Sequence, residues 1–132
     1  MPRRNAQKPT EAEMEILAVL WRRGAATVRE IHEIISAEKP SAYTTTLKLL
    51  QIMTGKGLVE REEAGRAHVY RAKLKRETTQ RKFTEDLLNR VFGGSAAQLV
   101  MRVLESKPAD AEELAEIRQM IDKAERSAKK RK

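Results

Sequence analysis

The first 57 residues contain three segments in which apolar side chains recur at helical spacing. Thr10 with Glu13, and Thr27 with Glu30, form capping-box patterns, and each pattern predicts a helix that begins at the residue after the threonine. The expected buried stripes are Ile16, Leu17, Leu20 and Trp21 in the first helix and Val28, Ile31, Ile34 and Ile35 in the second. The chain therefore opens with two amphipathic helices.

The third segment, SAYTTTLKLLQIMTGKG, covers residues 41–57 and predicts another amphipathic helix. Ser41 is a good N-cap, and Gly55 and Gly57 predict the end of the helix. Its apolar side chains are Leu47, Leu50 and Met53, with Leu49 and Ile52 beside them.

Three consecutive threonines, Thr44, Thr45 and Thr46, are unexpected at the start of this helix. Threonine is a poor helix former because its branched Cβ loses rotamer freedom. The threonines could cover free backbone N–H groups at the helix start, but one cap residue is enough for that, and Ser41 supplies it. A surface that meets DNA is the better explanation, because threonine hydroxyls bond either kind of base and the methyl group packs on the thymine methyl.

Two extended segments, residues 58–62 and 68–71, follow the third helix and flank the turn-like residues 63–66. This pattern predicts a β-hairpin with a charged tip. Three helices followed by a hairpin is the order of a winged helix-turn-helix. The third helix would be the recognition helix and the hairpin would be the wing.

From about Lys75 the apolar pattern is helical only, in three short segments that cannot bury their apolar faces by themselves. The simplest cover is a second copy of the same segment, which makes a symmetric dimer. The expected dimer interface is Phe83, Leu87, Leu88, Val91, Phe92, Leu99, Val103, Leu114, Ile117 and Ile121.

The predicted fold is therefore mainly α, a winged helix-turn-helix with a C-terminal helical dimerisation domain. Its expected parts are residues 1–9 as a basic N-terminal arm, 10–74 as the DNA-binding domain, 75–124 as the dimerisation domain and 125–132 as a disordered basic tail. The chain has no run of about 18 apolar residues and no apolar core of a secretory signal, so we expect a cytoplasmic protein and no membrane partner. The absence of cysteine excludes disulfides, thiolate metal sites and cysteine catalysis.

The net charge of +8 comes from the two ends of the chain, but the middle of the chain is also segregated by charge. Residues 39–76 carry +6, whereas residues 11–38 and 77–122 each carry −3. The positive block coincides with the third helix and the hairpin, and the start of a helix itself favours phosphate.

Double-stranded DNA is accordingly the expected partner of this block. Lys48 would face phosphate, although a merely solvated lysine is about equally expected, and Arg66 is exposed at the hairpin tip by Gly65. Basic residues 71–76 are a solvated run between domains or positioning contacts to the DNA backbone. The expected DNA contacts are Ser41, Tyr43, Thr44, Thr45, Thr46, Lys48 and Arg66.

The segments TEAEMEILAVLW, TVREIHEII, SAYTTTLKLLQIMTGKGLVERE and GRAHVYRA together resemble the penicillinase-repressor family, the BlaI/MecI-type repressors of β-lactamase and methicillin-resistance genes. The resemblance extends from about Thr10 to Ile121. It implies a dimeric winged-helix repressor on a palindromic operator, in which residues 43–46 reach major-groove bases and Arg66 lies against the DNA backbone.

The resemblance also implies release by a sensor-dependent protease that cuts the dimerisation domain. The family's Asn-Phe cut site is replaced here by Met101-Arg102-Val103, and Gln51 stands where many members carry arginine. One branch of the family senses copper through C-terminal cysteine pairs, which this chain lacks.

No motif for catalysis or metal binding is present. A Gly-rich phosphate loop, a serine elbow and a nucleophile-base pair are all missing, and His32-Glu33 lacks the second histidine of a helical zinc site. We therefore expect no enzyme activity and no cofactor. The predicted function is a sequence-specific DNA-binding repressor that acts as a homodimer. The alternatives are a winged-helix module that binds a protein without specific DNA binding, and a non-specific nucleoid protein that uses the basic ends.

Overall fold

Capping boxes begin the first two helices, as predicted. Thr10 Oγ1 accepts a hydrogen bond from the Glu13 amide (3.2 Å), and Glu13 Oε1 accepts one from the Thr10 amide (2.9 Å). Thr27 and Glu30 repeat the arrangement at the second helix. Two backbone N–H groups that a helix start leaves without partners are satisfied in each case.

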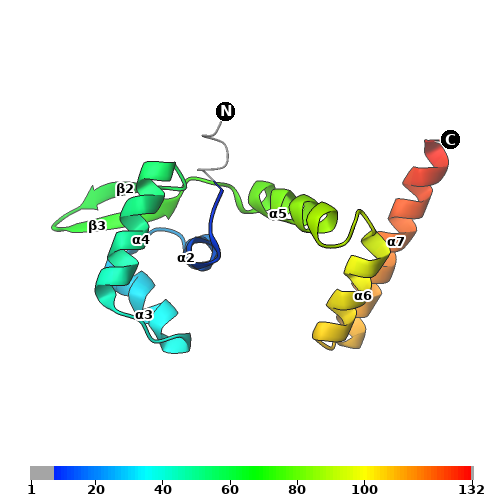
Figure 1. Ribbon diagram of the computed structural model, residues 1–132, viewed down its shortest axis with the longest axis horizontal. Helices are drawn as coiled ribbons and strands as arrows, with labels where there is room; N and C mark the ends of the chain where they lie inside the picture. The colour runs from blue at the N-terminus through cyan, green and yellow to red at the C-terminus, as the bar shows by residue number, and fades with distance from the viewer. Residues whose placement is uncertain (1–7, 132) are drawn as a thin grey trace. The chain divides into compact units, whose positions relative to one another are not determined.

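The computed structural model describes residues 8–131, so most of the predicted N-terminal arm lies outside the described residues. The chain divides into two compact units, and the boundary falls in the sequence between Lys82 and Phe83, within the helix labelled α5 in Figure 1. The elements are α2 (Glu11–Arg23), β1 (Ala26–Thr27), α3 (Val28–Glu38), α4 (Tyr43–Lys56), β2 (Val59–Ala64), β3 (Ala67–Ala72), α5 (Arg76–Arg90), α6 (Ala96–Ser106) and α7 (Ala111–Lys130).

The boundary between the units lies later in the sequence than the domain boundary that was predicted at residue 75. Trp21 Nε1 donates a hydrogen bond to the Leu74 carbonyl oxygen (3.0 Å), which joins α2 to the segment that leads into α5. Thr79, in the first turn of α5, is 4% exposed. The start of α5 is therefore part of the first unit, although the sequence pattern of α5 is continuous.

A three-stranded antiparallel sheet completes the first unit, with the strand order β1-β3-β2. The hairpin is longer than predicted: pairing continues to Ala64 and Ala67, so that only Gly65 and Arg66 form the turn. Gly65 has φ +66°, which glycine adopts without strain. Strand β1 was not predicted, because a two-residue strand has no periodicity and exists only through its pairing with β3.

The core of the first unit contains the predicted apolar stripes of α2, α3 and α4. Residues at the start of β2 and near the end of β3 complete it. Its buried side chains are Ile16, Leu17, Leu20, Ala26, Val28, Ile31, Leu50, Met53, Leu58, Val59 and Tyr70. Helix α4 ends at Gly57 with φ +81°, where the Leu58 amide donates to the Met53 carbonyl oxygen (2.9 Å). Gly55, predicted as part of the stop, lies inside the helix.

An ion pair in this core joins the start of α2 to the end of α4. Glu13 is 2% exposed, and Lys56 Nζ donates to its two carboxylate oxygens at 2.9 and 3.1 Å. Burial raises the pKa of Glu13, but hydrogen bonds from the Thr10 amide and from Lys56 outweigh it and hold the pKa below its ordinary value of 4.5.

We expect Lys56→Met to lower the free energy of unfolding by about 2–3 kcal/mol, because the Glu13 carboxylate would stay in the interior without its cation. Urea unfolding at pH 7 measures this change. Lys73→Met is the matched control on an exposed lysine and should change stability by less than about 0.5 kcal/mol. Equal losses in the two variants would contradict the assignment.

The same pair predicts how stability depends on pH. Because the pKa of Glu13 is lower in the folded state, its contribution is complete above pH 4.5 and is lost as the pH falls through the folded-state pKa. The Glu13→Gln variant should therefore lose less stability than the wild type on acidification below pH 4.5. An unchanged profile would show that Glu13 does not contribute.

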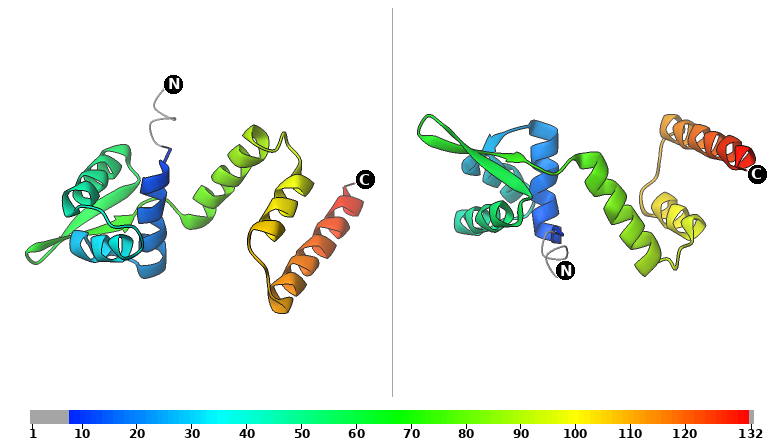
Figure 2. Two further views of the ribbon diagram at one scale, coloured as in Figure 1. Left: turned by 60° about the horizontal axis from the view of Figure 1, so that its bottom comes forward. Right: turned by 90° about the horizontal axis from the view of Figure 1, so that it is seen from above.

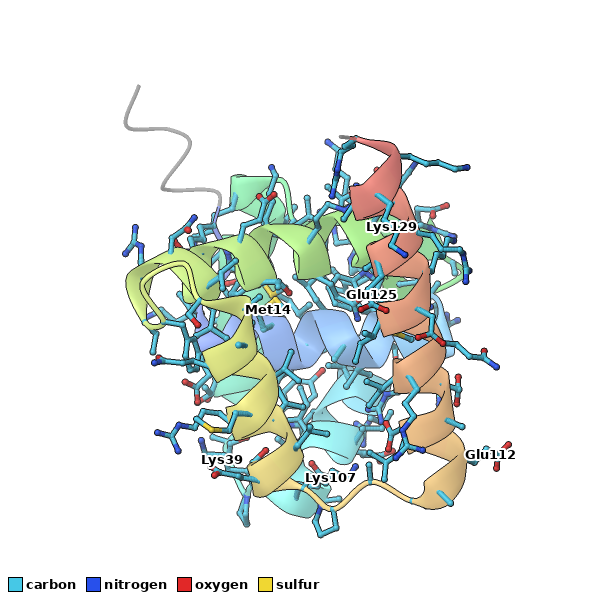
Figure 3. The ribbon with its side chains drawn as sticks, turned by 90° about the vertical axis from the view of Figure 1, so that its right-hand side faces the viewer. Met14, Lys39, Lys107, Glu112, Glu125 and Lys129 are labelled. Carbon is cyan, nitrogen blue, oxygen red and sulfur yellow. The ribbon has the colours of Figure 1, made fainter. Side chains whose placement is uncertain are left out.

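The second unit contains the rest of α5 together with α6 and α7. Helices α6 and α7 lie side by side and are joined by a connection that contains Lys107 (Figure 3). Ser95 and Asp110 cap α6 and α7, because their side chains accept hydrogen bonds from the Gln98 and Glu113 amides. The prediction of a disordered tail is wrong for residues 125–130, which continue α7. Alanine, lysine, arginine and glutamate are strong helix formers, and basic side chains stabilise a helix C-terminus.

Apolar side chains of the second unit are not buried. Between Phe83 and Arg131 no residue is buried, and Val103 and Ile121 remain 55% and 52% exposed. A shallow groove of about 620 Å³ between α6 and α7 is lined mostly by apolar residues. The unit therefore lacks a core of its own. No helix within residues 8–131 is long and apolar enough to cross a membrane.

Candidate nucleic-acid interface

The first two turns of α4 present Thr44, Thr45 and Lys48 to solvent. Residues three and four apart lie on the same side of a helix, so these three side chains form one exposed strip. The strip is short, polar and cationic at one end. A strip of this kind suits hydrogen bonding to base edges, because an α-helix fits the major groove of DNA.

Thr46 does not belong to this strip, which corrects the prediction that all three threonines face outward. It is 2% exposed, and its Oγ1 lies 3.0 Å from His32 Nδ1. The helical period explains its position, because Thr46 precedes Leu50 and Met53 by four and seven residues and so lies on the buried face with them. In this position Thr46 cannot contact DNA.

The start of α4 has no side-chain cap, and the prediction of Ser41 as N-cap is wrong. The N-cap is Ala42, and no described side chain accepts a hydrogen bond from the first turn. The Thr45 amide donates to the Ala42 carbonyl oxygen (3.1 Å), so the helix begins one residue too late for the Ser41 hydroxyl to cap it. The threonines do not cap it either. Amides at this end are left for solvent or for an anion such as phosphate.

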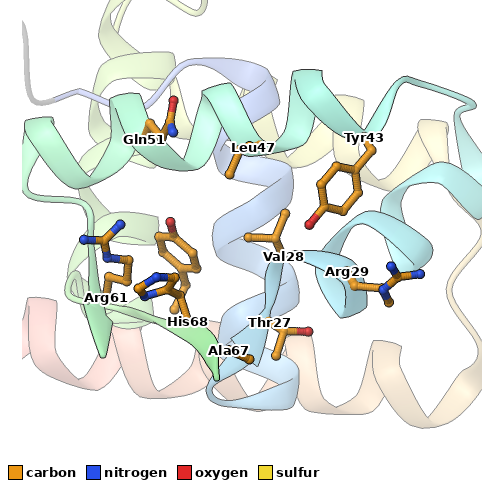
Figure 4. A pocket seen from close by; sticks show the side chains of 10 residues that line it. Thr27, Val28, Arg29, Tyr43, Leu47, Gln51, Arg61, Ala67 and His68 are labelled. Atoms are coloured by element: carbon orange, nitrogen blue, oxygen red, sulfur yellow. The ribbon is translucent and has the colours of Figure 1, made fainter. Parts of the chain in front are cut away.

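A groove of about 570 Å³ separates α4 from the hairpin in the first unit. In Figure 4, Tyr43, Leu47 and Gln51 lie along α4 on one side of the groove, while Arg61 and His68 lie on the hairpin on the other. The remaining lining residues are Thr27, Val28, Arg29, Ala67 and Tyr70. Two arginines and a histidine therefore surround a space next to the exposed strip, which favours a polyanion there.

The strand register places two of the three glutamates of β2 away from the groove: Glu60 and Glu62 lie on the opposite face of the hairpin, whereas Glu63 pairs with His68 on the face of Arg61. Arg61 pairs with Tyr70, so it shares the face that is buried further along the hairpin. Glu62 lies on the opposite face, where it accepts a hydrogen bond from Arg71 (2.7 Å). Arg71, which the sequence left open as a DNA contact, is thus held on the far face.

The hairpin tip extends beyond α3 and α4 (Figure 2). Arg66 lies in its two-residue turn and is exposed, as predicted. Its reach makes it available to a ligand that lies along α4. No cluster of three or more residues that could hold a metal ion occurs within residues 8–131.

The model of the penicillinase repressor family matches residues 9–123. The chain belongs to this family. This match confirms the resemblance seen in the sequence. The family is one of transcriptional repressors and not of enzymes. The match continues into the second unit and ends at residue 123.

Proteins with similar sequences are also named as repressors or transcriptional regulators, most of them at low sequence identity. The methicillin resistance regulatory protein MecI of Staphylococcus aureus (strain N315) is 23% identical over 114 residues, which cover 86% of this chain and 93% of that protein. The penicillinase repressor of Bacillus licheniformis is 23% identical over 113 residues, covering 86% and 88%. The transcriptional regulator BlaI of Mycobacterium tuberculosis (strain CDC 1551 / Oshkosh) is 39% identical over 61 residues, covering 46% and 44%.

The fold of this repressor-family chain also has a counterpart among solved structures. The solution structure of the DNA-binding domain of the repressor BlaI matches with a TM-score of 0.50 at 21% identity, covering 54% of this chain and 87% of that one. The likeness confirms the predicted winged-helix fold.

The sequence did not indicate four polar residues that line the groove of the candidate interface: Arg29, Gln51, Arg61 and His68. Arg61 stands in the run Glu60-Arg61-Glu62-Glu63, whose overall charge is negative. Its separation from Glu62 depends on the alternation of side chains along a strand, which is visible from the position of buried Val59 two residues earlier. That signal could have identified Arg61.

Proposed function

We propose that this protein is a sequence-specific DNA-binding repressor that reads bases with the start of α4. The observation that carries the proposal is the exposed strip of Thr44, Thr45 and Lys48, with an uncapped helix start and a basic groove beside it. Membership of a repressor family supports the same function. In the proposed complex α4 lies in the major groove, and Thr44 and Thr45 contact base edges.

Phosphate contacts in this proposal come from the groove and the hairpin. Arg61, Arg29 and His68 would meet the DNA backbone beside α4, and Arg66 would meet it at the hairpin tip. Lys48 would add a contact at one end of the strip, and Ser41 would add one just before the other end. Such contacts hold the protein on the duplex without choosing the sequence.

The proposed active form is a homodimer on a palindromic operator. Its support is the second unit, whose three helices expose apolar side chains on every helix, including Leu87, Val103 and Ile121. Large exposed apolar patches are typical of interaction surfaces. A second copy offers a surface of the same chemistry, and a two-fold axis then presents two copies of α4 to two half-sites about one helical turn apart.

Release from DNA by proteolysis is not included in this proposal. Arg102, at the place of the family's cut site, lies inside α6 and donates a hydrogen bond to Glu105 (2.9 Å). A protease would need local opening of that helix before it could cut.

Selection of bound fragments from the source genome tests the function. The full chain should enrich a small set of fragments that share an inverted repeat, with a Kd on the order of 10⁻⁸ M at moderate salt. Equal retention of all fragments would support the non-specific nucleoid alternative. Retention of none at low salt would support the protein-binding module. Either result would contradict the proposal.

Arg61→Gln and Arg66→Gln should each weaken binding to all sequences by a similar factor. Each removes one proposed phosphate contact, so the slope of log Kd against log salt should fall by about 0.9 while base preference stays the same. Arg71→Gln is the matched control, because Arg71 is paired with Glu62 on the far face of the hairpin. A salt slope that falls equally in all three variants would contradict the placement of DNA beside α4.

A further inference from the structure

One side chain of α3, His32, makes two contacts with the first turns of α4. Its Nδ1 lies 3.0 Å from Thr46 Oγ1, at hydrogen-bonding distance. Its ring also meets the Tyr43 ring edge-on, with centroids 5.5 Å apart and planes at 75°. Tyr43 is the residue that opens α4 and is 44% exposed, whereas Thr46 is buried. His32 therefore connects the interior of the first unit to the exposed start of its recognition helix.

The start of α4 needs such a connection because the helix provides little order of its own there. No described side chain caps it, and the Thr46 amide is 3.4 Å from the Ala42 carbonyl oxygen, a long hydrogen bond. Threonine is a poor helix former, and an uncapped helix end frays. By contrast, a complete capping box holds the start of α2 and that of α3.

We propose that His32 is a positioning residue for DNA reading, which holds Tyr43 and the first turn of α4 in the orientation in which Thr44 and Thr45 meet the bases. The inference rests on the proposed function. The contact with Thr46 fixes the rotation of α4 about its axis, and the ring contact restricts the Tyr43 side chain. Hydrogen bonds to base edges weaken steeply with small errors of distance and angle, so a loose first turn would bind DNA and discriminate poorly.

Two substitutions separate the two contacts of His32. His32→Phe keeps a ring beside Tyr43 and removes the polar atom at Thr46. His32→Asn keeps a polar atom of similar reach and removes the ring. Each should reduce discrimination between the selected operator and its one-base variants by roughly tenfold, the size of one base contact. The salt slope should stay unchanged, because no phosphate contact is lost.

Thr46→Val tests the same link from α4, since it removes the buried hydroxyl and keeps the shape of the side chain. It should reduce discrimination as His32→Phe does. The double variant, with His32→Phe and Thr46→Val together, should show no further loss. Lys56→Met serves as the control for stability, because it weakens the same unit at the other end of α4. It should keep the discrimination of the wild type.

Discrimination is measured as the ratio of Kd values for operator and one-base variants, at a temperature where every variant is folded by circular dichroism. Wild-type ratios in the His32 and Thr46 variants would overturn the inference and leave the proposed function intact. An equal fall in Lys56→Met would also overturn it, by showing that stability alone sets the ratio. A wild type that prefers no sequence would overturn the proposed function itself.

Discussion

Ile121→Glu is expected to dissociate the dimer and to weaken operator binding by about 100-fold or more. Ile121 is 52% exposed on α7 and lines the groove with Val100 and Leu104 of α6. In a dimer the new carboxylate would be desolvated without a partner, which costs several kcal/mol. Two linked half-sites then become two separate binding events, and the gain from the high effective concentration of the second site is lost.

Sedimentation velocity and operator binding measure the two effects of this substitution. Gln119→Glu is the matched control, an exposed position two residues away on the same helix, and it should stay dimeric. The helical signal of Ile121→Glu should also fall, because short helices that bury no apolar face are marginal in water. An unchanged dimer in Ile121→Glu would place the interface elsewhere.

The second large effect is expected for the double substitution of Thr44 and Thr45 by alanine. Affinity for the selected operator should fall about 10- to 100-fold, while affinity for random DNA changes little. Alanine is the better helix former, so the loss cannot come from an unfolded α4. Thr54→Ala, near the far end of the same helix, is the control, because the Thr54 hydroxyl donates to the Leu50 carbonyl oxygen and Thr54 is not part of the strip.

Competition between the operator and a random duplex of equal length measures this difference. If the double variant loses the same factor on both duplexes, Thr44 and Thr45 contact the backbone and do not read bases. The control separates a general effect of losing a threonine hydroxyl from an effect at the start of α4.

Helix starts and apolar faces were predictable because both depend on residues close in sequence. The capping boxes at Thr10 and Thr27 form within four residues, and the structure contains both. The wrong boundaries arise where local signals compete. Ser41 is a good cap residue, but the helix begins after Ala42. The basic residues after 125 predicted a disordered tail, although they are also strong helix formers.

The candidate interface was predictable in composition but not in detail. The positive block and the threonines indicated α4 and the hairpin, whereas the side on which each residue lies depends on packing. Thr46 turns inward with Leu50 and Met53, and Arg61 turns toward α4 because Tyr70 opposite it is buried. The contact of His32 with Thr46 joins residues 14 positions apart, and no spacing rule in the sequence indicates it.

The central claim is that duplex DNA lies against the start of α4 and the face of the hairpin that carries Arg61. Amide chemical-shift mapping of the full chain with its selected operator tests it most directly. The account predicts that the largest changes occur at residues 43–48 and 61–68, with small changes in α7. Large changes in α7 or at the far ends of the chain, with residues 43–48 unaffected, would contradict it.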